Sequence, residues 1–302
     1  FRPFSYTDAD YERWAAIAKA VHPDYPQSIE QAKLFDQTRT KDDVAGSFIV
    51  EVDGKAVGWV HYETPKNPVP GAVAIVLSVL PEYQQHMNEL WDFLHKQLQF
   101  VKPETLITMV TETWPEYKFY NSKGFTVYDR MWASNLDVTT FDSQPFERYL
   151  EKSERAGIQV KTLAEFPHHE DSFRRNWYAL IIELLQSVPS ADPTVPWSYE
   201  TWLVRTPVNP NLLPEGYFFA LDGEEIIGMS ELAKSYRAKT LQTGLTGVKV
   251  LHRRKGIAQT LKIRAAQFAK DHGVQFIRTN NHHINYPMLS INEAMGFVKE
   301  PA

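Results

Sequence analysis

The 302-residue chain contains no cysteine, no excess of basic charge and no long apolar run. The absence of cysteine excludes disulfide bridges, thiolate nucleophiles and cysteine-based zinc or iron–sulfur sites. The net charge of −5 argues against a general nucleic-acid-binding surface, which is normally basic. No run approaches the roughly 18 apolar residues of a membrane span, and residues 1–14 lack the form of a signal peptide. We therefore expect a cytoplasmic protein that binds neither nucleic acid nor a membrane. Its oligomeric state could be a monomer or a homodimer.

What the chain does contain is a long-period repeat. With 43% hydrophobic residues it can bury a sizeable core, and its length suggests two domains. Residues 47–63 and 216–232 are both alternating apolar runs around an Asp-Gly pair, at Asp53 and Asp222, which predicts a β-hairpin. Each run is followed by the patterns of a strand, an amphipathic helix, a second strand and a short helix ending in Gly-Phe. The order predicts an α/β chain built from two copies of one unit.

The ends of the two copies set the expected domain boundaries. Residues 142–157 carry alternating charges, Pro145 in a first turn and a final Gly157, which predicts a solvated linker helix. We therefore expect a first domain at 1–142, a linker at 143–156 and a second domain at 157–302. Strand-like residues 126–138 follow the first Gly-Phe pair, whereas only five residues follow Phe297. The last strand of the second copy thus either comes from elsewhere or lies beyond residue 302.

The turn between a strand and a helix in the second copy favours an anion. Residues 248–261, VKVLHRRKGIAQTL, place three consecutive cations and a glycine at this point. The free amides and the positive dipole end of a helix N-terminus attract phosphate groups. Gly256 lets the backbone approach the ligand, while Arg253, Arg254 and Lys255 add positive charge. Neither Gly-Lys-Ser/Thr nor Gly-x-Gly-x-x-Gly is present, which argues against a nucleoside triphosphate site or a dinucleotide fold.

This stretch resembles motif A of the GCN5-related N-acetyltransferases, R/Q-x-x-G-x-G/A, with Arg253, Gly256 and Ala258 at its fixed positions. The resemblance covers the second copy and extends to the first as a tandem arrangement, similar to mycothiol synthase-like members. It implies two tandem acyl-CoA N-acyltransferase folds, each a mixed, mostly antiparallel sheet flanked by helices. Residues 279–297 are similar to the later pattern of the family through Thr279, Asn281, Asn285, Met288, Asn292 and the pair Gly296-Phe297.

The resemblance implies acetyl-CoA as the co-substrate and an amine of a small molecule as the acceptor, which attacks the thioester directly. The pyrophosphate would bind the amides from Arg254 to Gln259. The preceding strand end would bind the pantetheine and the thioester oxygen, and Asn285 would bond the cofactor arm. The implied cofactor-binding residues are Val248, Val250, Arg253, Arg254, Lys255, Gly256, Ile257, Ala258, Gln259, Asn285 and Asn292, and no metal is implied.

The catalytic residues are less directly implied. Asn292 stands where many relatives carry a tyrosine that protonates the coenzyme A thiolate. A thiol with a reference pKa of about 8.5 needs little help near neutral pH, and an amide can still bond the sulfur. Glu231 is the leading candidate for the general base, although a single glutamate on a strand is more often a solvated residue. His282, just beyond a strand end, is an alternative that would act through water. The pair His282-His283 does not predict a metal site, because adjacent side chains diverge.

Residues 187–202 form a proline-rich, aromatic segment where the family shapes its acceptor pocket. Asp192, Trp197 and Tyr199 would suit a cationic or aromatic amine, because a carboxylate and aromatic faces both attract cations. The same composition also fits a packed connecting loop.

The first copy lacks the anion-binding features. Gln84, Met87 and Glu89 replace the arginine, glycine and alanine of the turn, and residues 67–95 contain no Lys or Arg. Tyr120 keeps the proton-donor position, and we expect it to be a core aromatic. The first domain is therefore predicted to be acetyltransferase-like without binding coenzyme A. Two other functions stay open: a non-catalytic acyl-CoA sensor, and an aminoacyl transferase using charged tRNA, which the intact turn and the acidic balance disfavour.

Overall fold

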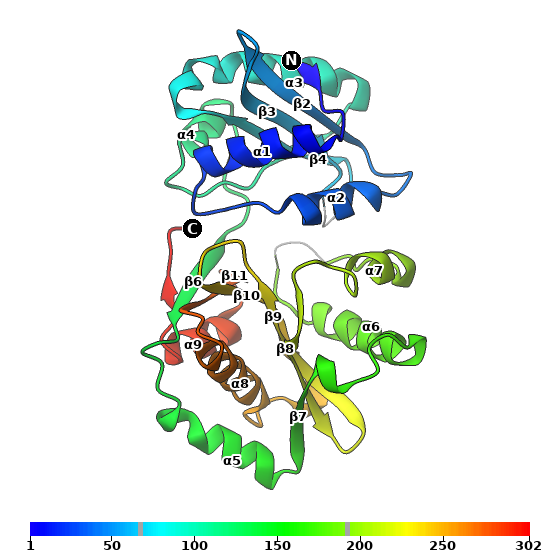
Figure 1. Ribbon diagram of the computed structural model, residues 1–302, viewed down its shortest axis with the longest axis vertical. Helices are drawn as coiled ribbons and strands as arrows, with labels where there is room; N and C mark the ends of the chain where they lie inside the picture. Colours follow the sequence, from blue (N-terminus) through cyan, green and yellow to red (C-terminus); the bar gives the residue numbers. More distant parts are fainter. Residues whose placement is uncertain (66–68, 191–193) are drawn as a thin grey trace. The chain divides into compact units, whose positions relative to one another are not determined.

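The computed structural model describes residues 1–65, 69–190 and 194–302, and the chain forms two compact units, Phe1–Phe125 and Thr126–Ala302 (Figure 1). Each unit contains one mixed, mostly antiparallel sheet with helices on both faces. The predicted α/β class with two tandem units of one fold is confirmed.

The first unit is a five-stranded sheet in the order β1-β2-β3-β4-β5. Its tight turn at Asp53-Gly54 has both residues in the left-handed region, with φ of 50° and 76°, as a two-residue hairpin requires. The elements are β1 Arg2–Pro3, α1 Asp8–Val21, α2 Ile29–Gln37, β2 Ala45–Val52, β3 Lys55–Glu63, β4 Ala72–Val79, a 3₁₀ helix Pro81–His86, α3 Met87–Val101, β5 Thr105–Ile107 and α4 Pro115–Ser122.

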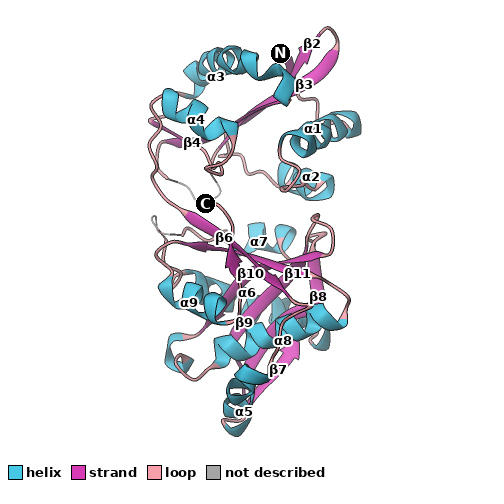
Figure 2. Ribbon diagram, turned by 90° about the vertical axis from the view of Figure 1, so that its left-hand side faces the viewer, coloured by secondary structure: helices cyan, strands magenta, loops and turns pink. Residues whose placement is uncertain are grey.

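Helices cover both faces of this first sheet (Figure 2). On one face Tyr11 of α1 packs with Phe4 and Ile49, and residues of α2 lie against the same cluster. On the other face α3 buries Leu90 and Leu94 against the sheet. Alternation along the strands separates the two clusters, because successive side chains of a strand point to opposite faces.

The second unit is a seven-stranded sheet in the order β12-β6-β11-β10-β9-β8-β7. Helices α8 and α9 cover one face and α6 and α7 the other (Figure 1). The elements are β6 Met131–Asp137, α5 Glu147–Arg155, β7 Ile158–Thr162, α6 Asp171–Leu185, α7 Tyr199–Arg205, β8 Leu212–Asp222, β9 Glu225–Lys234, β10 Thr240–Val248, a 3₁₀ helix Val250–His252, α8 Ile257–Asp271, β11 Phe276–His282, α9 Tyr286–Ala294 and β12 Val298–Lys299.

The predicted boundary at residue 142 is wrong, because β6 belongs to the second unit. All seven residues of β6 pair with β11, from Met131 with His282 to Asp137 with Phe276. Leu136 and Val138 are buried in the core that α8 covers. The missing last strand of the second copy therefore comes from upstream in the chain, and β12 pairs with only two residues of it.

The predicted linker helix at 143–156 is also part of the second unit. α5 packs on the first turn of α8, where the hydroxyl of Ser153 lies 2.9 Å from that of Thr260. Thr260 in turn donates to the backbone carbonyl of Tyr149 at 3.0 Å. The alternating charges of α5 lie only on its outer face. None of the helices in the described ranges is long and apolar enough to cross a membrane.

We predict that a fragment of residues 126–302 unfolds cooperatively and that a fragment of residues 143–302 does not. The shorter fragment lacks β6, so it loses the whole ladder to β11 and the packing of Leu136. This loss is comparable with the net stability of a domain, about 5–15 kcal/mol. Urea titrations followed by far-UV circular dichroism would test it, and equal transition midpoints for the two fragments would contradict it.

Candidate functional site

The strands β10 and β11 are parallel neighbours over only three residue pairs, Thr240–Gln242 with Phe276–Arg278. Beyond this point β10 stays paired with β9 as far as Val248, and β11 stays paired with β6 as far as His282. Because each strand follows a different neighbour, the two diverge towards their carboxyl ends. We call this divergence the strand split. It leaves one edge of β10 and one edge of β11 without a partner strand.

A bulge in β10 lies beside the strand split. The register with β9 shifts between Thr243 and Thr246. A side chain at Gly244 would overlap the carboxylate of Glu231 on β9, so any other residue there would have to displace this carboxylate. Burial raises the pKa of Glu231, and the backbone N–H of Leu245 that bonds it offsets this only in part. The leading base predicted from sequence therefore lies directly against the bulge.

The side chains around the strand split lie on both faces of the sheet. Glu231 is paired with Tyr217, which belongs to the core under α6, and Leu245 packs against the same core. Ile277 of β11 lies in the opposite core, under α8. His282 is an odd number of residues further along the strand, so it lies on the α6 face with Glu231. Both predicted bases therefore share one face.

The turn that leads into α8 is shaped for an anion. Arg254 and Gly256 are both left-handed, with φ of 63° and 87°. A left-handed arginine is strained by about 1–2 kcal/mol, which is typical of functional turns. No side chain caps α8, and its first backbone bond runs from Thr260 N–H to the carbonyl of Gly256. The amides of Ile257 to Gln259 therefore have no partner within the helix.

The three cations of this turn have different roles. The Nε of Arg253 donates to the carbonyl of Val248 at 2.9 Å, which ties the turn back to the strand. Arg254 and Lys255 are exposed and form no ion pair with any residue that the structure describes. Val250 lies in a 3₁₀ turn, because β10 ends at Val248. The expectation that Val250 belongs to the splayed strand is wrong: the strands already part after Gln242.

The predicted asparagines lie on α9 and beside it. The Oδ1 of Asn285 caps α9 by accepting from Met288 N–H at 3.4 Å. Asn292 is buried, and its Nδ2 donates to the Oδ1 of Asn281 on β11 at 2.7 Å. The Oδ1 of Asn292 has no hydrogen-bond partner among the described residues. A buried acceptor without a donor costs about 1–3 kcal/mol.

Sequence reasoning missed Lys262, which is only 4% exposed. It follows Ala258 by one turn on the same side of α8, and its ammonium lies 4.9 Å from the centre of the Phe297 ring. Burial lowers the pKa of Lys262 to about 8. The available signal was a lysine at a position that the helical period places next to buried Leu261 and Ile263.

In the first unit the equivalent divergence is filled by the protein itself. β4 and β5 pair only over Ala72–Ala74 and Thr105–Ile107. Beyond these pairs the hydroxyl of Tyr120 accepts from Leu77 N–H at 3.0 Å, and the hydroxyl of Thr108 donates to the carbonyl of Ile75 at 2.9 Å. Burial raises the pKa of Tyr120 to about 12. Tyr120 is thus a core aromatic, as predicted, and it bonds the backbone of β4.

The helix that follows β4 offers no open N-terminus. The 3₁₀ helix 81–86 runs directly into α3, and Met87 is buried in the core. The side chains of His86 and Glu89 meet at 3.0 Å at the start of α3. The absence of coenzyme A binding in the first unit stays a prediction.

Two of the three predicted acceptor residues can be described, because Asp192 lies outside the described residues. Trp197 and Tyr199 pack against the α6 core. The guanidinium of Arg205 lies 4.8 Å from the Trp197 ring centre, and that of Arg175 lies 4.6 Å from the Tyr199 ring centre. Both rings already hold a cation of this chain, which favours the packing interpretation of the segment.

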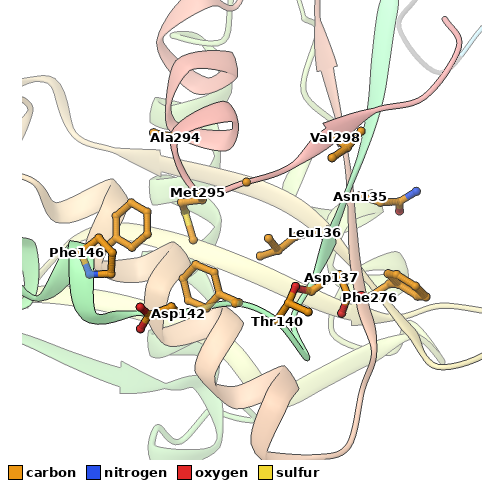
Figure 3. A pocket seen from close by; sticks show the side chains of 13 residues that line it. Asn135, Leu136, Asp137, Thr140, Asp142, Phe146, Phe276, Ala294, Met295 and Val298 are labelled. Carbon is orange, nitrogen blue, oxygen red and sulfur yellow. The ribbon is translucent and has the colours of Figure 1, made fainter.

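A shallow hollow of about 600 Å³ lies elsewhere in the second unit (Figure 3). Asp137, Asp142 and the rings of Phe141 and Phe146 line it, together with residues 294–298. Asp137 pairs with Phe276 at the closed end of the strand split. The hollow is therefore separate from the candidate site.

Comparisons with known proteins agree with this geometry. Residues 178–297 match the model of the acetyltransferase (GNAT) family. Among solved structures, a tandem GNAT protein from the clavulanic acid biosynthesis pathway is 17% identical, with a TM-score of 0.72 over 99% of this chain and 94% of that one. A GCN5-related N-acetyltransferase from Sphaerobacter thermophilus is 15% identical, with a TM-score of 0.64 over 98% and 91%. No curated protein matches.

Residues 178–297 of the second unit thus match a GNAT acetyltransferase domain. The chain as a whole has the tandem GNAT fold, and the family typically uses acyl-CoA. Residues 178–297 include the strand split, the turn before α8 and the Gly-Phe pair after α9.

We predict that Tyr120→Phe destabilises the first unit by about 1–3 kcal/mol, because Leu77 N–H loses its buried acceptor. Urea unfolding would measure the change. Tyr286→Phe removes a hydroxyl from a side chain that is 68% exposed, and it is expected to shift stability by less than about 0.5 kcal/mol. Equal effects of the two substitutions would contradict the prediction.

Lys262→Met is expected to stabilise the protein at pH 7 by about 1–3 kcal/mol, because it removes a buried charge and keeps an unbranched side chain that is only one atom shorter. The pKa of Lys262 is lower in the folded state than its ordinary 10.5. The advantage of methionine should therefore be constant below about pH 8 and shrink between pH 8 and 10.5. Thermal unfolding across this range would test it, with exposed Lys234→Met as the control that should show no such trend.

Proposed function

We propose that the second unit transfers an acetyl group from acetyl-CoA to an amine of a small molecule, by direct attack in a ternary complex. One observation carries this proposal: the strand split ends at a helix N-terminus without a side-chain cap, beside two cations that form no ion pair with the described part of the chain. The pairing of these features suits a donor with a pyrophosphate at one end and a thioester at the other.

The residues of the turn have the chemistry to hold the pyrophosphate. The free amides of Ile257, Ala258 and Gln259 would donate to its oxygens, and Arg254 and Lys255 would neutralise its charge. Gly256 adopts a conformation that other residues rarely reach, and a side chain there would press on Tyr149. Arg253 would act indirectly, by holding the turn to Val248.

The bulged edge of β10 would hold the pantetheine arm and the thioester. Backbone N–H groups on an unpaired edge can donate to the carbonyl oxygen as it gains charge in the transition state. Asn292 would supply an acceptor to the cofactor arm or to the thiol, since its Oδ1 has no other partner among the described residues. Asn285, whose Oδ1 caps α9, keeps its Nδ2 for the same arm.

The acceptor nitrogen attacks the thioester carbon, and the carbon–sulfur bond breaks with its electron pair on sulfur. An amine is mostly protonated near neutral pH, so it must first give one proton to water and attack in its neutral form. The nitrogen must then lose a second proton as the amide forms, and a base must take this proton. Glu231 and His282 both lie on the α6 face and are the two candidates. The structural relatives include N-acetyltransferases, which supports the same reaction class.

We predict that Gly256→Glu weakens acetyl-CoA binding by more than about 100-fold, because a carboxylate and a side chain enter the anion turn. Gly273→Glu is the matched control, since Gly273 is also left-handed, with φ of 68°, and has open space around its Cβ at the far end of α8. Isothermal titration would measure both. Equal losses would show that backbone strain, and not the turn, governs binding.

Release of free thiol from acetyl-CoA, measured across a panel of amines, tests the transfer itself. We expect at least one small amine to be acetylated by the wild-type protein and not by Gly256→Glu. Tight coenzyme binding without thiol release for any amine would instead favour an acyl-CoA sensor.

A further inference from the structure

A carboxylate and an imidazole meet at the carboxyl end of β11. Asp129 lies two residues before β6 begins, and His282 is the last residue of β11. The pairing of Met131 with His282 brings the two segments together. As a result the Nδ1 of His282 lies 2.8 Å from the Oδ2 of Asp129.

The carboxylate of Asp129 is itself fixed. Its Oδ1 accepts from the backbone N–H of Arg130 at 2.7 Å and lies 3.4 Å from the Nδ1 of His283. The contact with His282 has the distance of an ion pair but lacks hydrogen-bond alignment. A positive charge on the imidazole would strengthen its attraction to this carboxylate.

The orientation of His282 leaves one ring nitrogen for a substrate. Its Nδ1 is buried, although the side chain as a whole is 19% exposed. The exposed part therefore lies on atoms other than Nδ1, and no described residue bonds Nε2. A carboxylate at Nδ1 fixes the tautomer that carries its proton there and leaves Nε2 as the acceptor.

His282 also lies on the right side of the strand split. It shares the α6 face with Glu231, opposite the face on which α8 presents the anion turn. A donor bound at that turn and threaded through the split would expose its thioester to this face. An acceptor arriving from the α6 side would meet Nε2 of His282.

We propose that Asp129 positions His282 as the base that takes the proton from the acceptor amine, which rests on the acetyl transfer proposed above. As the carbon–nitrogen bond forms, the nitrogen loses one proton to Nε2 of His282. The carbon–sulfur bond breaks, the thiolate takes a proton from water, and the imidazolium returns its proton to water. The charge of Asp129 stabilises the imidazolium while it exists.

This assignment differs from the expectation drawn from sequence, which favoured Glu231. The carboxylate of Glu231 is packed against Gly244 and bonded by Leu245 N–H, so its oxygens are partly committed to the bulge. His282 has an uncommitted nitrogen. Asp129 could not be connected with it from sequence, because residues 126–138 look like the end of the first copy.

The test compares steady-state kinetics of His282→Ala, Asp129→Asn and Glu231→Gln, with the amine that the wild-type protein acetylates fastest. We expect His282→Ala to lower kcat by about 10²–10³-fold with unchanged acetyl-CoA affinity, because general-base catalysis contributes about that much. Free imidazole should restore part of the rate in this variant only. Asp129→Asn should lower kcat by about 10-fold, and Asp129→Glu should recover part of it.

The controls separate the two proposals. His272→Ala removes an exposed histidine at the end of α8 and should keep the wild-type rate, with or without imidazole. Activity of His282→Ala within threefold of wild type would overturn the base assignment while leaving the transfer intact. So would a larger loss in Glu231→Gln than in His282→Ala. If the wild-type protein binds acetyl-CoA but acetylates no amine, the proposed function and this assignment both fail.

Discussion

The divergence of β10 from β11 is imposed by the strands outside them. β9 holds β10 along its length, and β6 holds β11, so the two central strands cannot close on each other after Gln242 and Arg278. Unpaired backbone N–H and C=O groups cost about 1–3 kcal/mol each when they are buried. A sheet built this way must either fill the gap with its own side chains or keep it for a ligand. The turn into α8 and the bulge beside Glu231 both sit at the margin of that gap.

The two units resolve this constraint in opposite ways. In the first unit Tyr120 and Thr108 bond the backbone of β4, and α3 starts without an open N-terminus. In the second unit the position of that tyrosine is held by Asn292, which is too short to reach the same place and bonds Asn281 instead. The tyrosine and the threonine together therefore close the first split, whereas the shorter asparagine bonds a side chain of β11 in the second. The same fold can therefore have a filled or an open strand divergence, depending on a few side chains.

Local patterns in the sequence were enough to predict most of this architecture. The Asp-Gly turns, the amphipathic helices and the glycine of the anion turn act over a few residues, so they can be read without a fold. The position of β6 in the second sheet could not be predicted from sequence, because strand pairing joins residues that are far apart. The strand-like residues 126–138 fit either unit. Asp129 was missed for the same reason. Lys262 was missed because the helical pattern was counted on apolar residues alone.

β6 therefore has two roles in the second unit. Its ladder keeps β11 away from β10, and its first pair, Met131 with His282, sets where Asp129 meets the imidazole. A movement of β6 and β11 as one pair would carry Asp129 and His282 together, because both lie at the same end of one ladder. The distance between base and carboxylate is thus protected, whereas the width of the strand split is not. Substitutions in β6 should consequently act first on donor binding and only later on proton transfer.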